Sequence, residues 1–450
     1  MKQKNTKKIA IIGAGWAGLT AAIALTQKGM QVSIFEAAPQ TGGRARTVLW
    51  KSQGQTLEID NGQHILVGAY HNALSLLKQI GIPTETVLQR LPFGLPLPEG
   101  WKLKAAPLPA PLHLLTALFQ SNYSAAQRLQ LLSFAYRIIS QAYKPGLTVQ
   151  QWLGDLQGPI WDELIEPLCV AALNTPAQQA CAYRFAVTLR KTLLASSTAS
   201  NFLIPKVGLS DLFCKQAQQW LTNHGAQIFL SSPVRTLTIK AAQVEINETL
   251  FDTAIVATGA HIARHLIAQA DLQARLASLN FEPIATSYLR LAQASSSFRL
   301  PAPMIALPSK LHGYEFAHSL NSAATGLGHW AFLRQIATKE GQTVPVLAVV
   351  SSAARDALNL SRDQWLDNIC MQVRNIWPQL PDITDSMIIV EKRATFSCTP
   401  FAAGLGNATN NPRVFLAGDY TEAQLPATLE SAVISGHKAA QQVLASHFMH

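Results

Sequence analysis

Three glycines near the start of the chain constrain its fold more than any other feature. Gly13, Gly15 and Gly18 form the pattern GxGxxG between a β-branched run at Lys8–Ile12 and an Ala- and Leu-rich stretch at residues 16–28. Periodicity predicts a buried strand and then a helix. Gly13 permits the tight turn, Gly15 lets a pyrophosphate approach the backbone, and Gly18 lets helix and strand pack closely. The pattern predicts an α/β fold with dinucleotide phosphates at the helix N-terminus.

The residues after the next predicted strand indicate which dinucleotide is bound. Glu36 directly follows the strand Gln31–Phe35, where a carboxylate can accept hydrogen bonds from a ribose diol. A carboxylate at this position disfavours the 2′-phosphate of NADP, so NAD and FAD remain. A glycine pair ending at Gly43 is followed by Arg44, which can reach the diphosphate from the other side. Arg46 either assists Arg44 or faces solvent.

A motif near the other end of the chain favours FAD. Gly418 and Asp419 follow a short apolar run, and a helix is predicted to begin near Ala427. The Asp419 carboxylate can bind a ribityl hydroxyl, and the helix N-terminus can stabilise negative charge at the flavin N1–C2=O edge. A nicotinamide dinucleotide has no group for such a site. Thr428 contacts the flavin edge or merely starts the helix, and Tyr420 adjoins the motif.

Predicted strands recur at the start, middle and end of the chain, which indicates a discontinuous nucleotide domain. We expect residues 1–71, 206–261 and 386–450 to form the FAD-binding domain. Residues 72–205 and 262–385 would form an inserted substrate domain of mixed α+β structure. Helical patterns cover residues 112–143, 152–173, 180–194 and 362–377, and strand patterns cover residues 234–239, 285–291, 344–351 and 387–396.

Composition and charge restrict the function. Only 14% of the residues are charged, so more apolar surface than usual is expected, as in a protein that handles a greasy substrate or touches a bilayer. The net charge of +10 is thinly spread, without basic clusters interleaved with aromatics, which argues against nucleic-acid binding. Attraction to anionic lipid and a simply basic surface both remain. The five scattered cysteines form no CxxC, so we expect reduced thiols in a cytoplasmic protein and no metal site.

The N-terminus is similar to a targeting segment. The basic start MKQKNTKK precedes an uncharged stretch at residues 9–27, as in a signal peptide or membrane anchor. The three glycines inside this stretch and Glu36 beyond it favour a nucleotide-binding unit instead. No other segment is long enough to span a bilayer without charges, so a soluble or peripheral protein is expected.

These motifs resemble those of a known superfamily, the flavin amine oxidase and phytoene desaturase-like proteins, which have a glutathione-reductase-type FAD fold. The resemblance lies in GAGWAGL (13–19), Glu36, GGR (42–44), VATGA (256–260) and LAGDYTEAQLPATLESAVISG (416–436). Within that group the chain is similar to the squalene-associated FAD-dependent desaturases, the hydroxysqualene dehydroxylases of bacterial squalene and hopanoid synthesis. That similarity is carried by DNGQHILVGAY (60–70), WDELIEPLCVAALNTP (161–176), SNFLIPKVGLSDLF (200–213) and EKRATF (391–396).

The resemblance implies a reduction by the flavin. Hydroxysqualene, a C30 allylic alcohol, would lose its hydroxyl group and gain a hydride from reduced FAD, giving squalene. The departing hydroxide needs a proton, so a general acid is expected near the flavin. Asp60, His64 and Tyr70 lie in the segment that the family places there. Each has another interpretation: Asp60 as a turn cap, His64 as a core histidine and Tyr70 as a packing residue.

Other partners and functions stay open. The stretch 107–140 mixes leucines and aromatics with arginines, so it either dips into the bilayer or simply covers the substrate tunnel. We expect a cytoplasmic protein on the inner face of the cytoplasmic membrane. The electron donor is unidentified, because the sequence has no second GxGxxG. A carotenoid-type desaturase, a flavin amine oxidase (with Lys392 as an uncertain flavin-side lysine) and a non-catalytic FAD or lipid carrier are the alternatives.

Overall fold

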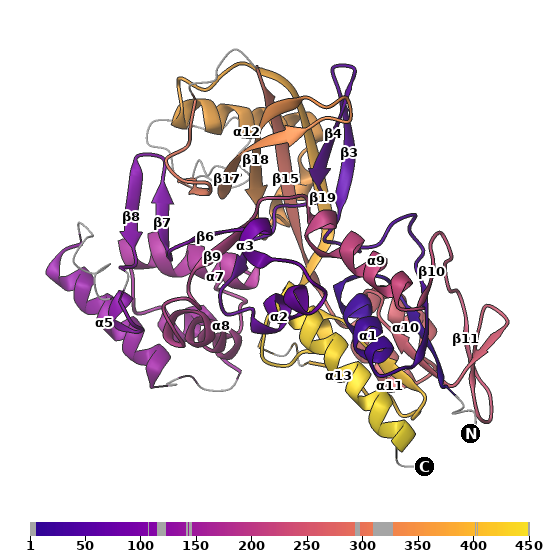
Figure 1. Cartoon of the computed structure of the whole chain (residues 1–450). Helices are drawn as coiled ribbons and strands as arrows, with labels where there is room; N and C mark the ends of the chain where they lie inside the picture. Colours follow the sequence, from indigo (N-terminus) through magenta and orange to yellow (C-terminus); the bar gives the residue numbers. More distant parts are fainter. Residues whose placement is uncertain are drawn as a thin grey trace.

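Two sheets and a helical region make up the protein. The structure is a computed structural model that describes residues 6–106, 108–114, 123–140, 143, 146–292, 298–308, 327–400, 402 and 404–448. In Figure 1 a layered unit around α1 and α13 lies at the lower right, near both chain ends, and the sheet with β15, β17 and β18 lies at the top. The helical region lies on the left, with α5 at its outer edge.

The first sheet is parallel and has five strands in the order β10-β2-β1-β14-β20. Its strands are near-continuous apolar runs, as expected where helices cover both faces. After its first residue, each of β1 and β2 is buried throughout. The strand bounds are Lys8–Ile12 (β1), Gln31–Phe35 (β2), Gln227–Phe229 (β10), Thr253–Val256 (β14) and Val414–Leu416 (β20).

Helices cover the two faces of this sheet. α1 (Trp16–Gln27), α9 (Lys215–Asn223) and α13 (Leu429–Phe448) share a buried apolar cluster with one face. α10 (Ala260–Leu266) and α11 (Ala270–Ala277) contribute to the cluster on the other face. The strand–helix–strand unit predicted from the glycine pattern is therefore present at the start of a doubly covered sheet.

The second sheet is antiparallel, with strand order β16-β17-β18-β15-β19. α12 (Arg362–Ile376) packs on one face through a cluster that includes Trp365 and Trp377. The strand bounds are Phe281–Leu291 (β15), Ile305–Ala306 (β16), Trp330–Ala337 (β17), Thr343–Ser351 (β18) and Ile383–Phe396 (β19).

A hairpin from the N-terminal part of the chain covers the other face of this second sheet. β3 (Thr47–Ser52) and β4 (Gln55–Asp60) pair with each other, and Trp50 and Leu57 share a buried cluster with Tyr288 of β15. The hairpin thus links the loop after β2 to the second sheet, and it ends at Asp60, where the predicted catalytic segment begins.

Smaller elements complete the fold. Three short sheets or hairpins contain β5 (Leu66–Val67), β9 (Phe202–Pro205) and β6 (Leu88–Leu91); β7 (Gly94–Leu97) and β8 (Gly100–Lys104); and β11 (Leu237–Ile239), β12 (Val244–Ile246) and β13 (Thr249–Phe251). The remaining helices are α2 (His71–Gln79), α3 (Thr84–Val87), α5 (Ala125–Ile139), α6 (Val149–Leu153), α7 (Glu166–Leu173) and α8 (Ala182–Leu189). Short π-helical turns cover Trp161–Ile165, Arg190–Leu194 and Ser210–Cys214, and 3-10 turns cover Asp356–Asn359 and Asp419–Thr421.

Some predicted elements differ from the structure. The helical pattern predicted over residues 152–173 is interrupted in the structure, because α6 ends beside Gly154 and helical structure resumes only at Pro159. The strand predicted over residues 234–239 is limited to Leu237–Ile239. Of the helix predicted over residues 112–143, α5 is present, while residues 115–122 and 141–142 lie outside the described residues.

The division into two domains stays a proposal, and one boundary needs a change. The parallel sheet draws its strands from the three stretches proposed for the FAD-binding domain. However, β19 pairs with β15 from Phe396 back to Ile383, so residues 386–396 extend the second sheet. We found no helix among the described residues that is both long and apolar enough to cross a membrane.

Candidate functional site

The glycine loop between β1 and α1 leaves open space on one side. A Cβ on Gly13 would lie 2.6 Å from the carbonyl oxygen of Ala257, and φ at Gly13 is +107°. A Cβ on Gly18 would lie 2.0 Å from the carbonyl oxygen of Gly13. A Cβ on Gly15 would meet no atom of the described residues within 4 Å. Packing within the chain therefore requires glycine at two positions, whereas the third borders space that a bound group can fill.

The start of α1 is suited to phosphate. Gly15 is the N-cap of α1 and has no side chain with which to satisfy the free amides of the first turn. Those N–H groups and the positive end of the helix dipole favour an anion. The loop therefore has the shape and the charge that a diphosphate requires, and the cofactor-binding roles of Gly13, Gly15 and Gly18 stay predictions.

Glu36 lies at the end of β2, beside the glycine loop. Its carboxylate accepts hydrogen bonds from the backbone N–H groups of Ala14 (2.7 Å) and Ala38 (2.9 Å). Because a carboxylate has about four acceptor positions, these two bonds orient Glu36 and leave capacity for ribose hydroxyls. The predicted ribose contact fits this geometry.

The second glycine loop packs directly against the first. The Gly42 N–H donates to the carbonyl oxygen of Ala14 (2.8 Å), and a Cβ on Gly43 would lie 3.3 Å from the Cα of Gly15. Arg46 donates to the carbonyl oxygen of Gly43, which places its guanidinium on this loop. Both loops therefore border the same space, as expected if they bind one diphosphate.

Arg44 joins this loop to the C-terminal motif. Its guanidinium donates to the Asp419 carboxylate (2.7 Å) and to the carbonyl oxygen of Ala394 (2.6 Å). Asp419 also accepts a hydrogen bond from the N–H of Tyr420 (3.0 Å). The structure thus brings together two predicted cofactor residues from opposite ends of the chain. The side chains of Arg44 and Asp419 contact each other in the structure. Their contacts with the diphosphate and ribityl groups of FAD stay predictions.

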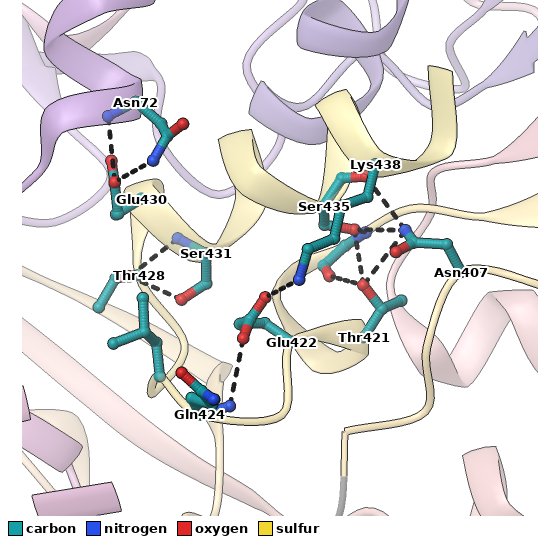
Figure 2. Close-up of polar contacts among 12 residues, drawn as sticks. Asn72, Asn407, Thr421, Glu422, Gln424, Thr428, Glu430, Ser431, Ser435 and Lys438 are labelled. Carbon is teal, nitrogen blue, oxygen red and sulfur yellow. Dashed lines mark hydrogen bonds and ion pairs between the residues drawn. The ribbon is translucent and has the colours of Figure 1, made fainter. Parts of the chain in front are cut away.

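A buried polar cluster fixes the turn that carries Asp419. Figure 2 shows Asn407, Thr421 and Ser435 in mutual contact beneath this turn. The Ser435 hydroxyl accepts from the N–H of Gly418 (2.8 Å), and a Cβ on Gly418 would lie 2.5 Å from the Tyr420 ring. The cluster therefore ties α13 to the Gly-Asp turn, and sequence reasoning missed Asn407 and Ser435.

Thr428 starts α13, one of the two roles considered from the sequence. Its hydroxyl accepts from the N–H of Ser431 (3.1 Å), as an N-cap does. The Thr428 side chain lies beside the Tyr70 hydroxyl, where it opposes the increase that burial causes in the pKa of Tyr70, so the predicted catalytic segment meets the C-terminal motif here. A contact between Thr428 and the flavin edge stays a prediction.

Two helix starts meet at this point. Glu430, in the first turn of α13, accepts from the N–H of Asn72 (3.0 Å), from its side-chain amide (2.7 Å) and from the N–H of Ala73 (2.8 Å). Figure 2 shows the carboxylate directed at α2, whose first turn it caps. Sequence reasoning missed this role, because no local pattern pairs residues 358 positions apart.

The Asp60 carboxylate is held by the chain itself. It accepts from the N–H of Leu209 (2.8 Å) and from the hydroxyl of Thr47 (3.0 Å), and Arg334 lies 3.9 Å away. Burial raises the pKa of Asp60, while the Leu209 N–H and Arg334 oppose the increase. These partners join β3, β4 and the 206–214 segment, so the geometry favours a positioning role. A catalytic role stays a prediction.

Burial keeps both His64 and Tyr70 in their neutral forms. The His64 Nδ1 lies 3.1 Å from the carbonyl oxygen of Gly62, and burial lowers the pKa of His64, with nearby Arg44 adding to the decrease. A carbonyl can only accept, so Nδ1 carries the proton and Nε2 is an acceptor. Burial raises the pKa of Tyr70 well above its ordinary value, so its phenol stays protonated.

One acidic residue near this segment was also missed. Glu391 of β19 lies 3.4 Å from the side-chain amide of Asn61, and its charge acts on both Arg44 and His261. The motif EKRATF contains it, but only the sheet pairing brings β19 to the loop after β4. All five cysteines are free, and Cys370 alone of them is partly exposed.

The residues therefore fit FAD. Two glycine loops border one open space, Glu36 lies beside them at the end of β2 where the ribose contact is predicted, and the Arg44–Asp419 pair joins the second loop to the C-terminal motif. A family model for flavin-containing amine oxidoreductases matches residues 16–444. The chain belongs to this family.

Relatives that match this family member over nearly their full length include hydroxysqualene dehydroxylases and a carotenoid desaturase. It is 28% identical to the hydroxysqualene dehydroxylase of Zymomonas mobilis, over 96% of this chain and 98% of that protein. It is 29% identical to the one of Rhodopseudomonas palustris, over 98% and 99% respectively. It is also 21% identical to zeta-carotene desaturase of Synechocystis sp., over 98% and 97%. The resemblance inferred from the motifs is confirmed.

The fold of this flavoprotein is shared with solved structures. The structure of cyclohexylamine oxidase from Brevibacterium oxydans superposes with a TM-score of 0.68 and 16% sequence identity. The match covers 99% of this chain and 100% of the oxidase. The predicted α/β class with an FAD-binding Rossmann domain is confirmed. The family member is an FAD-dependent oxidoreductase.

Proposed function

We propose that this flavoprotein reduces hydroxysqualene to squalene in squalene and hopanoid synthesis. The observation that carries the proposal is the similarity to hydroxysqualene dehydroxylases over nearly the whole length of both chains, at 28% and 29% identity. The similarity therefore extends through the second sheet and the helical region, where substrate specificity is expected to reside. Identity to the zeta-carotene desaturase is lower, at 21%.

The proposed reaction balances as a two-electron reduction. The C–O bond of the allylic alcohol breaks, a C–H bond forms at an allylic carbon, and the hydroxide takes up one proton and leaves as water. Reduced FAD supplies the hydride when bound. The protein must orient the alcohol, exclude water and provide a hydrogen-bond donor to the departing oxygen.

We assign the donor role to Tyr70. Its buried phenol stays protonated, and it lies beside Thr428 of the C-terminal flavin motif. We assign to His64 the role of orienting the substrate hydroxyl. Its neutral ring has Nδ1 bound to Gly62, so Nε2 is available to accept a hydrogen bond. Asp60 would position this segment through Leu209 and Thr47.

The direction of the flavin chemistry separates the two candidate functions. A desaturase of the carotenoid type would remove hydrogen from a polyene precursor with oxidised FAD, and the 21% identical desaturase favours keeping this as a second candidate. The test incubates the reduced and the oxidised enzyme, without oxygen, with hydroxysqualene and with phytoene. Squalene formed only by the reduced enzyme supports our proposal, and hydrogen removal from phytoene by the oxidised enzyme supports the alternative.

The electron donor is a separate protein or small reductant in this proposal. The sequence has one GxGxxG, at Gly13, Gly15 and Gly18, and the FAD site accounts for it. We further propose that the enzyme acts in the cytoplasm at the inner face of the membrane, because its C30 substrate partitions into lipid.

A further inference from the structure

The outward face of α5 is apolar. Its most exposed large side chains are Leu129 (68% exposed), Leu132 (48%), Tyr136 (69%) and Ile139 (55%). Their spacing of three, four and three residues places them along one stripe of the helix. Figure 1 shows α5 at the outer edge of the molecule, on the opposite side from α1, α10 and α11.

The inward face of the same helix is also apolar. Leu131, Phe134 and Ile138 are buried in the core. A surface helix normally has polar residues opposite its buried face. On α5, however, every fully exposed residue is apolar: Ala125, Ala126, Leu129, Leu132, Ala135, Tyr136 and Ile139. The polar residues of α5 lie at half-buried positions between these two faces, namely Gln127, Arg128, Gln130, Ser133 and Arg137. An apolar outward face is usual where that face is also removed from water.

The segment just before α5 has the same character. Leu108 and Leu112 are 41% and 50% exposed. Together with α5, they account for six of the thirteen large apolar side chains that are well exposed on the described residues. Exposed apolar groups are therefore concentrated in one short part of the chain, which marks an interaction surface rather than ordinary scatter.

Charge in this part of the chain indicates the partner. Between Trp101 and Gly154 the sequence has neither Asp nor Glu. The same stretch has five basic residues: Lys102, Lys104, Arg128, Arg137 and Lys144. Arg128 and Arg137 are half-buried residues of α5 itself, and Arg137 pairs with Asp155, just beyond this stretch. With Asp155 included, this part of the chain keeps a net positive charge, and an apolar helix face in a positively charged part of the chain fits an anionic lipid interface.

We propose that the exposed face of α5 docks on an anionic phospholipid bilayer, with the helix lying in the plane of the interface. A protein partner also needs an apolar centre, but the five basic residues of this stretch outnumber the one acidic residue that borders it, Asp155, and this excess of positive charge favours anionic lipid. This inference concerns membrane attachment and does not depend on which isoprenoid the enzyme reduces. If the proposed reaction is also correct, α5 brings the enzyme to the phase that holds its substrate.

The test measures binding of the FAD-loaded enzyme to vesicles without substrate. Sedimentation with vesicles of phosphatidylcholine and phosphatidylglycerol gives a partition coefficient, and pure phosphatidylcholine vesicles isolate the contribution of charge. The variant combines Leu129→Gln, Leu132→Gln and Ile139→Gln, which lie on the exposed face and leave the core of α5 unchanged. The matched control combines Leu49→Gln, Leu250→Gln and Ile262→Gln, which are 55%, 43% and 42% exposed elsewhere on the surface.

We expect the α5 variant to lose on the order of 100-fold in partition coefficient, since three apolar side chains no longer enter the interface. The control should bind like the wild type, and both variants should retain FAD and the wild-type melting temperature. Weaker binding to uncharged vesicles is also expected. Equal binding by variant and wild type, or no binding by the wild type, would overturn the proposal. So would a wild-type dimer that the α5 variant converts to monomer, because α5 would then contact a second copy.

Discussion

The guanidinium of Arg44 lies 2.7 Å from the carboxylate of Asp419, although 375 positions separate the two residues. This ion pair joins the loop after β2 to the turn before α13. Asp419 is almost buried, with 7% of its side chain exposed, while Arg44 is 41% exposed. The pair thus closes a site whose two halves come from opposite ends of the chain.

Asp419→Ala should weaken FAD binding. The substitution removes a ribityl ligand in our account and also frees Arg44 to move away from the site. We expect the Kd for FAD to rise by roughly 10- to 100-fold, in line with the loss of a charge-assisted contact. Titration of the apoprotein with FAD, followed by flavin fluorescence, measures the change. Lys240→Ala, which breaks an exposed pair with Glu245, is the control and should leave the Kd unchanged.

Two glycine substitutions should have opposite effects. A side chain at Gly15 meets open space in the protein alone, whereas one at Gly18 collides with the carbonyl oxygen of Gly13 at 2.0 Å. Gly15→Val should therefore leave the melting temperature of the apoprotein within a few degrees of the wild-type value and reduce FAD affinity at least ~10-fold. Gly18→Ala should lower the melting temperature of the apoprotein itself. A Gly15→Val protein with unchanged FAD affinity would place the diphosphate elsewhere.

Glu430 should contribute to stability through α2. It is 4% exposed and caps α2 through the N–H groups of Asn72 and Ala73. Glu430→Ala leaves the buried N–H of Ala73 without an acceptor and removes the cap from Asn72, so we expect a loss of about 1–3 kcal/mol in the free energy of unfolding. Urea denaturation measures the loss. Glu430→Gln keeps one acceptor oxygen and should recover part of it, whereas an unchanged stability of Glu430→Ala would contradict the capping role.

His329 should make the fold sensitive to acid. Burial lowers the pKa of His329 to about 4, and its Nδ1 accepts from the N–H of Ser352 (2.9 Å), which requires the neutral ring. A lowered pKa means that this stabilisation is fully present above about pH 6.5 and is lost as the pH falls towards 4. We expect about 2 kcal/mol of unfolding free energy to disappear over that range.

The matching variant is His329→Gln, whose amide oxygen can accept from Ser352 but does not titrate. The difference in unfolding free energy between pH 7.5 and pH 5, measured from denaturation curves, should be smaller for His329→Gln than for the wild type. His71→Gln, at an exposed histidine, should retain the wild-type difference. A His329→Gln protein with the full wild-type pH dependence would assign the effect to other groups.

Tyr70→Phe should separate catalysis from cofactor binding. The variant keeps the ring but removes the hydroxyl that lies beside Thr428. We expect the rate of squalene formation to fall by about 10²-fold, within the range for a lost proton or hydrogen-bond donor, with little change in FAD content. His64→Gln, which keeps an acceptor near the substrate, should lose less. Full activity in Tyr70→Phe would exclude it as the donor.

The sequence predicted the nucleotide-binding half well, because its signals are local. Gly13, Gly15 and Gly18 lie between two strands, and their spacing alone specifies a strand–turn–helix unit. The Gly418–Asp419 turn was likewise visible as a short motif. Both motifs were found because the residues that form each turn lie within a few positions of one another in the sequence.

Contacts between distant segments were not predictable in the same way. Nothing local to Asp60 shows that Leu209 and Thr47 occupy its carboxylate, or that Glu430 caps α2. Residues 386–396 were assigned to the FAD-binding domain, because the apolar pattern of this strand fits either sheet and only its pairing with β15 shows that it extends the second sheet. The exposed stripe of α5 could not be separated from its buried stripe, because both are apolar.

The central claim is that reduced FAD in this protein delivers a hydride to hydroxysqualene, and a single turnover in D₂O tests it most directly. The enzyme is photoreduced without oxygen and mixed with one equivalent of hydroxysqualene, and flavin absorbance and extracted lipid are followed together. We predict that flavin oxidation and squalene formation proceed at the same rate and in equal amounts, and that the squalene carries one deuterium. A flavin that stays reduced in the presence of hydroxysqualene, or squalene without deuterium, would contradict the account.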